Sequence, residues 1–88
     1  MEQFRFAFLI MLADHDSSKD HRQIETPLCK SIIIGVKDIE DACRQAKKLT
    51  DSNEISKIEL CGAFQKEGAE IIQKYIENKI PVGYVSNL

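Results

Sequence analysis

A short run of carboxylate and imidazole side chains is the first place where this sequence has the means for chemistry. Asp14, His15 and Asp16 stand directly after the apolar run at residues 6–12. A histidine that a carboxylate holds in one orientation can move a proton near neutral pH, and negative charge on both sides favours the protonated imidazole. We therefore expect these three residues to be the catalytic candidates, although their types leave open whether the protein is an enzyme.

The same polar segment raises the question of a metal site, because it also contains His21 and Glu25. A divalent transition metal accepts two nitrogen ligands and one or two oxygen ligands. The spacing matches no metal motif, however, and the i, i+4 histidine pair of HExxH is missing. We expect a solvated loop in which an aspartate caps a turn, and we assign no metal site. A metal sensor or carrier built on His15 and His21 is the alternative.

The second candidate site is the stretch Cys61, Gly62, Ala63 and Phe64, which precedes a predicted helix. A glycine turn before a helix exposes backbone N–H groups at the positive end of the helix, and these can hold phosphate or carboxylate. The GxGxxG pattern is absent, so a tight turn explains the glycine equally well. Cys61 near a helix start could be a nucleophile, but a cysteine that ends a buried strand is more often inert. We expect the four residues to contact a ligand.

Periodicity predicts the elements that position these groups. The expected strands are residues 4–12, 31–36, 55–61 and 80–85. One expected helix follows Asp38, which is its N-cap, with Asp41 at the third helical position, and the second expected helix runs over residues 65–78. The first strand is almost continuously apolar, which predicts that both of its faces are covered. The polar connection 13–30 is long, and such connections are often functional or contain a short helix.

The order β-loop-β-α-β-α-β predicts one α/β domain over residues 1–88. Consecutive βαβ units close with parallel strands, so we expect a four-stranded, mostly parallel sheet with two main helices, half-Rossmann or flavodoxin-like, in the strand order 2-1-3-4. Ligands bind beyond the carboxyl ends of such strands. His15 and Cys61 should then border one pocket if the first and third strands are parallel. An uncovered sheet face would be a dimer surface.

Composition narrows the class of protein. The 88 residues carry a net charge of −2 and scattered lysines and arginines, which argues against nucleic-acid binding. The apolar run 6–12 is too short to span a membrane. The three cysteines form no CxxC pair, so we expect reduced thiols and a cytoplasmic protein. A chain this small buries little surface, so self-association would stabilise it.

Several stretches resemble a known family: FAFLI at residues 6–10, DHD at 14–16 and ELCGAF at 59–64, together with 24–26, 67–69 and 81–83. The likeness is to short, uncharacterised prokaryotic proteins that form a domain of unknown function. It implies a stand-alone cytosolic protein and supplies neither an activity nor functional residues. In that family a Gly-Pro pair usually follows the Phe. Gln65 and Lys66 stand there in this chain, which weakens the interpretation as a phosphate cradle.

Two functions remain in competition. The first is binding of a small molecule, with an anion as one candidate, at the carboxyl ends of the strands; the residues specify no cofactor. The alternative is a non-catalytic, homo-oligomeric assembly module that buries one face of its sheet. The expected partners are a small-molecule ligand and further copies of the chain, and not nucleic acid or membrane.

Overall fold

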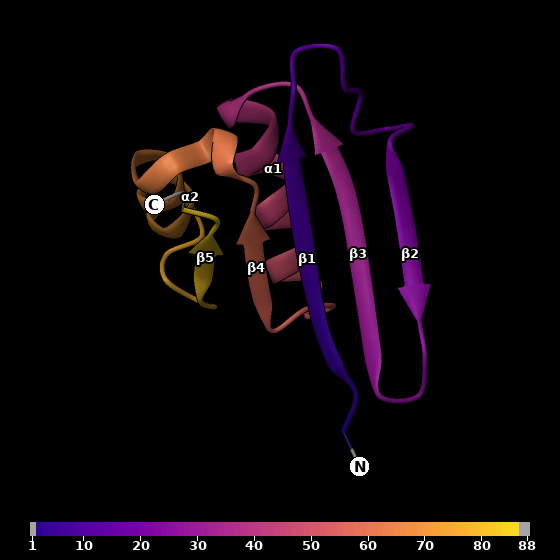
Figure 1. The fold of residues 1–88 in the computed structure, drawn as a ribbon. Coiled ribbons are helices and arrows are strands. Elements are labelled where there is room, and N and C mark those ends of the chain that lie inside the picture. Colours follow the sequence, from indigo (N-terminus) through magenta and orange to yellow (C-terminus); the bar gives the residue numbers. More distant parts are fainter. Residues whose placement is uncertain (1, 87–88) are drawn as a thin grey trace.

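The computed structural model describes residues 2–86, which form a mixed five-stranded sheet and two α-helices (Figure 1). The elements are β1 (Phe4–Met11), β2 (His21–Glu25), β3 (Cys29–Val36), α1 (Ile39–Asp51), β4 (Lys57–Leu60), the 3₁₀ turn η1 (Gly62–Phe64), α2 (Gln65–Tyr75) and β5 (Val82–Tyr84). The strands lie in the order β2-β3-β1-β4-β5. β1 is parallel to both β3 and β4, and β5 is parallel to β4.

The four expected strands have the expected relative order and direction, but the expected count of four is wrong. β2 is a fifth strand, antiparallel to β3, inside the segment predicted to be a loop. All five of its residues are exposed, so no alternation of buried and exposed residues marks it. A two-residue turn joins it to β3, closed by the backbone of Thr26 and Cys29, with N···O distances of 2.8 and 3.3 Å.

Both helices begin as predicted, whereas the last helix and strand are shorter than predicted. The Asp38 carboxylate accepts the backbone N–H of Asp41 at 2.8 Å and starts α1. Glu77 and Asn78 have φ near +58° and +57°, so α2 ends at Tyr75 instead of continuing to residue 78. Because Pro81 has no backbone N–H to donate to the sheet, β5 begins at Val82.

The core lies between one face of the sheet and both helices. Ala7 and Leu9 of β1 point into this core and are fully buried, and Met11 packs against it. Phe4, Phe6 and Phe8 project from the other face of β1, over which no helix passes; in Figure 1, α1 runs behind the sheet. A doubly wound fold has helices on both faces, so the half-Rossmann or flavodoxin-like prediction is not confirmed.

Candidate functional site

His15 lies where β1 ends, against the sheet face that carries no helix. Its Nδ1 is 3.2 Å from the carbonyl oxygen of Ile10. A carbonyl only accepts, so Nδ1 must donate, and Nε2 is left as the nitrogen that can meet a ligand or a proton. The ring packs on Gly35, where a Cβ atom would be 2.8 Å from Nδ1. Glycine at this position lets the imidazole approach the sheet.

The carboxylates beside His15 stabilise the loop and make no hydrogen bond to the imidazole within residues 2–86. Asp16 accepts the hydroxyl of Ser18 at 2.6 Å and its backbone N–H at 3.0 Å. These two hydrogen bonds hold the pKa of the Asp16 carboxyl below its ordinary value. The Asp20 carboxylate accepts the N–H of Asp16 at 2.7 Å, and Asp14 is exposed. The loop after β1 therefore has a defined shape.

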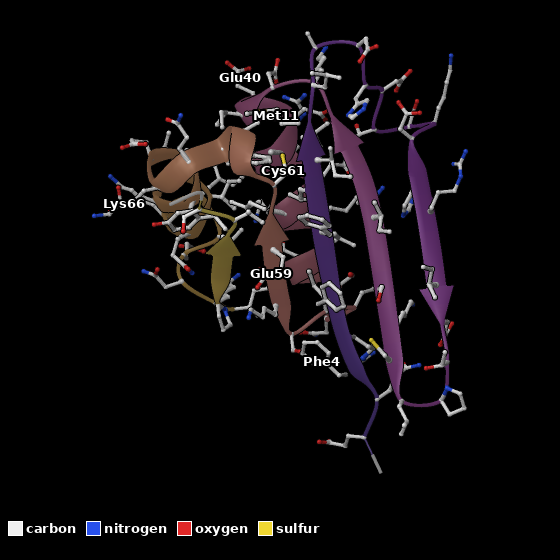
Figure 2. The ribbon with its side chains drawn as sticks, viewed as in Figure 1. Phe4, Met11, Glu40, Glu59, Cys61 and Lys66 are labelled. Carbon is white, nitrogen blue, oxygen red and sulfur yellow. The ribbon has the colours of Figure 1, made fainter. Side chains whose placement is uncertain are left out.

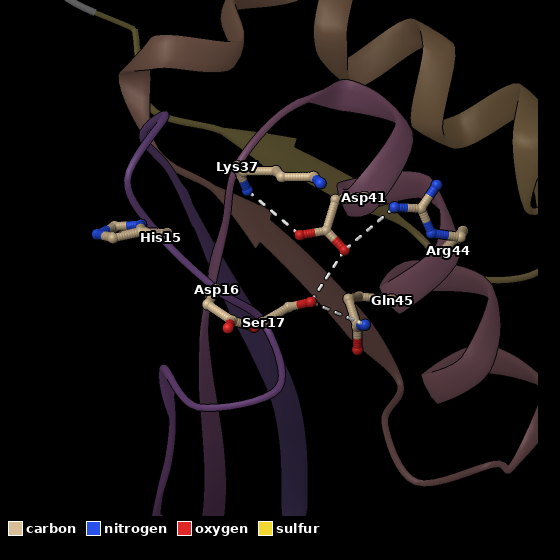
Figure 3. A pocket seen from close by; sticks show the side chains of 7 residues that line it. All are labelled: His15, Asp16, Ser17, Lys37, Asp41, Arg44 and Gln45. Carbon is tan, nitrogen blue, oxygen red and sulfur yellow. Dashed lines mark hydrogen bonds and ion pairs between the residues drawn. The ribbon is translucent and has the colours of Figure 1, made fainter.

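A polar cleft of about 480 Å³ opens between this loop and the start of α1. We call it the α1 cleft. It is lined by His15, Asp16, Ser17, Lys37, Asp41, Arg44 and Gln45. Figure 3 shows His15 on one side of it and Arg44 on the other, with Ser17 between them. The cleft is at the carboxyl ends of β1 and β3, the edge at which the sequence predicted a site.

Asp41 is the centre of the hydrogen bonds that join the loop to α1. Although it is charged, its exposed fraction is only 5%. One carboxylate oxygen accepts the Ser17 hydroxyl at 2.9 Å, and the other accepts the backbone N–H of Lys37 at 3.2 Å. The Arg44 guanidinium is 3.6 Å away, and Gln45 donates to the Ser17 hydroxyl at 3.3 Å. Three separate segments of the chain are thus held around one buried carboxylate.

Two cationic side chains, Lys37 and Arg44, border this cleft and have hydrogen-bond donors that are not in use. Arg44 approaches Asp41 at a distance longer than a strong charge-assisted hydrogen bond, and its side chain is otherwise solvated. The Lys37 ammonium forms no ion pair with any described residue. Each oxygen of the Asp41 carboxylate already accepts a hydrogen bond from a neutral donor. The Lys37 ammonium and most N–H groups of the Arg44 guanidinium therefore remain available to a further acceptor.

Cys61 lies on the other side of the end of β1 (Figure 2). Its Sγ accepts the N–H of Met11 at 3.4 Å, whereas His15 binds the carbonyl of Ile10. These two groups belong to one peptide unit, in which C=O and N–H point in opposite directions. The end of β1 therefore separates His15 from Cys61, and none of the described hollows contains both residues.

The remaining residues of the second candidate stretch form η1 and the entry to α2. Phe64 is buried in the core and packs on Gly68, where a Cβ atom would come within 3.0 Å of it. Ala63 is exposed. Gly62 borders a separate hollow of about 370 Å³ with Gln65, Lys66, Tyr84, Val85 and Ser86. The assignment of residues 61–64 to a ligand stays a prediction, and it concerns a different place from the α1 cleft.

The described residues contain no group of three His, Cys, Asp or Glu side chains that could hold a metal ion. The two histidines are on opposite faces of the sheet: His21 pairs in register with Ile34, which points to the helices, and His15 covers the other face. In the part of the chain that the structure describes, no helix has the length and apolar character needed to cross a membrane.

Sequence reasoning missed most of the residues that line the α1 cleft. The sequence marks Asp41 only as a residue of the first helical turn, and it does not single out Ser17, Lys37, Arg44 or Gln45. One signal was present: Lys37 directly follows a predicted strand, and the rule that ligands bind beyond carboxyl ends applies to it as well as to His15. No residue type or spacing showed that the loop would be held against α1.

Comparison with known proteins places the chain in a family. No curated protein matches it, and no solved structure matches it. A family model does match, over residues 4–88, and therefore over nearly the whole chain. This protein belongs to the family of unknown function DUF6506.

Proposed function

We propose that this protein binds a small anionic molecule in the α1 cleft. The observation that carries the proposal is that Lys37 and Arg44 border a carboxylate, Asp41, each of whose oxygens already accepts a hydrogen bond from a neutral donor. A phosphate or carboxylate group between the two cations would accept charge-assisted hydrogen bonds. The guanidinium suits such a group because its N–H donors lie in one plane as a fork.

His15 and Ser17 contact the ligand beside the two cationic side chains. Nε2 of His15 is the ring nitrogen not used by the Ile10 carbonyl, and it is placed to donate to a ligand or to exchange a proton with it. Ser17 offers a hydroxyl that Gln45 and Asp41 hold in place. Asp16 acts as a positioning residue, because its carboxylate accepts from Ser18 and fixes the loop. These roles retain the predicted histidine and give its neighbouring carboxylate a different task.

Isothermal titration with inorganic phosphate and with citrate tests the proposal. Lys37→Ala and Arg44→Ala should each weaken binding roughly tenfold, equivalent to about 1.4 kcal/mol. Lys74→Ala is the matched control, since Lys74 is an exposed lysine in the last turn of α2, and it should bind like the wild type. Equal affinities for all four proteins would contradict the proposal, as would the absence of measurable binding to either anion.

The alternative function, assembly through one sheet face, is favoured by a different observation, the row of aromatic side chains on β1 that no helix covers. The row itself does not line the α1 cleft, and only His15 borders both the cleft and the face that carries the row.

A further inference from the structure

Within residues 2–86, one face of the sheet carries no helix, and the loop after β1 covers only its upper end, where His15 lies over Gly35. On that face β1 presents Phe4, Phe6, Phe8 and Ile10, and the register places Cys29, Ser31, Ile33 and Gly35 of β3 beside them. The rings of Phe4 and Phe6 stack with centroids 5.4 Å apart. Figure 2 looks onto this face, with Phe4 near the amino end of β1. We call it the open face.

An open face of this kind is unusual for parallel strands. Sheets built from parallel strands occur almost only with both faces covered, and four of the five strands here are parallel. β1 is apolar on both sides, which is the pattern of a strand covered twice. Because α1 and α2 are both on the other face, no helix of residues 2–86 supplies a second cover.

We propose that a second copy of this chain covers the open face, in a two-fold dimer with sheet packed on sheet. The area agrees with that occupant. The five strands contain 28 residues in all. At about 3.3 Å per residue and about 4.8 Å between strands, the face measures about 440 Å² before side-chain relief is counted. Two such faces make about 900 Å² before side-chain relief is counted, which is close to the roughly 1000 Å² that a specific interface needs.

The total surface of the protein leads to the same conclusion. The accessible surface is 5770 Å², whereas about 5200 Å² is expected for a folded monomer of this mass. The excess of about 570 Å² is of the same order as the area of one open face. A chain of this size has a small hydrophobic core, so burying the open face would add to its stability.

Charge placement makes the open face complementary to itself. β1 and β3 carry no charged side chain on it, and the charges are at the flanks: Arg22 on β2, and the Lys57–Glu59 ion pair of 2.8 Å on β4. A two-fold interface requires each patch to match its own copy. Here an apolar centre meets an apolar centre and the charges form a rim, which is the usual anatomy of an interface.

Sedimentation equilibrium from 1 to 100 µM tests the proposal. The wild type should approach twice the 10.0 kDa mass of one chain. Phe4→Lys and Ile24→Lys place a charge on the open face and should each raise the dissociation constant at least tenfold. Phe4 is 50% exposed and Ile24 is 61% exposed, so neither change disturbs the core, and circular dichroism verifies the fold.

Ile71→Lys is the matched control, because Ile71 is 49% exposed but belongs to α2 on the opposite side of the molecule. It should dimerise like the wild type. A monomeric wild type at 100 µM would overturn the proposal, and so would a dimer that Phe4→Lys and Ile24→Lys leave intact. Phosphate titration of the Phe4→Lys protein keeps the two proposals separate, since loss of the dimer should leave the α1 cleft able to bind.

Discussion

Removal of the Asp41 carboxylate is the sharpest test of how the α1 cleft is built. In Asp41→Ala the hydroxyl of Ser17 and the backbone N–H of Lys37 lose their acceptor, and Arg44 loses its nearest negative charge. A hydrogen bond to a charged group contributes about 1.5–3 kcal/mol. Two such bonds at a buried site, reduced by partial access of water to Ser17, give a loss of about 3 kcal/mol in the free energy of unfolding.

Urea denaturation followed by circular dichroism measures this loss, and a thermal scan should show a fall in Tm of about 12–24 °C. Asp41→Asn retains one oxygen as an acceptor and should cost about half as much. Glu40→Ala is the control, because Glu40 is the exposed neighbour in the same helical turn, and surface changes usually stay within about 0.5 kcal/mol.

The reasoning is refuted if Asp41→Ala costs no more than Glu40→Ala. The cleft would then not depend on the buried carboxylate, and the loop after β1 would be held by something else. If the loss is as large as expected, the same variant should also bind phosphate more weakly, because Ser17 and Arg44 no longer have a fixed place. Asp41 is thus a positioning residue, and its effect on stability distinguishes it from Lys37, whose removal should leave stability nearly unchanged.

Three further predictions concern single positions. Gly35→Ala should push the imidazole of His15 off the sheet and abolish its donation from Nδ1, seen as a changed tautomer in ¹⁵N NMR; an unchanged ring signal would contradict the packing. Hydrogen bonds from Ser18 lower the pKa of Asp16, so their stabilisation is complete above the ordinary value of 3.8 and is lost as pH falls through the lowered value; in Asp16→Asn this acid-dependent change in loop amide signals should be absent. Ile34→Ala should cost about 2–5 kcal/mol in urea denaturation, because the side chain is fully buried, and a cost below 1 kcal/mol would place it outside the core.

The sequence predicted most of the fold because the core elements carry strong local signals. β3 is β-branched and apolar, and α1 begins at an aspartate whose side chain caps it. β2 was missed because it is an edge strand with every residue exposed. β2 forms because it pairs with β3, and the residue types of a polar segment do not indicate which strand it will pair with.

The candidate site was only partly predictable for a related reason. The position of His15 at the carboxyl end of β1 follows from the end of an apolar run. Its separation from Cys61 follows from the two directions of one peptide group, which is a property of the sheet and not of residue spacing. The contact between Ser17 and Asp41 joins residues 24 apart, and no local pattern encodes it.

The most direct test of ligand binding in the α1 cleft is a ¹H–¹⁵N NMR titration of the wild type with inorganic phosphate. We predict saturable shifts of the amides of Ser17, Lys37 and Arg44, with those of Gly62 and Lys66 unchanged. Shifts concentrated at Gly62 and Lys66, or shifts that grow in proportion to phosphate without saturation, would contradict the account.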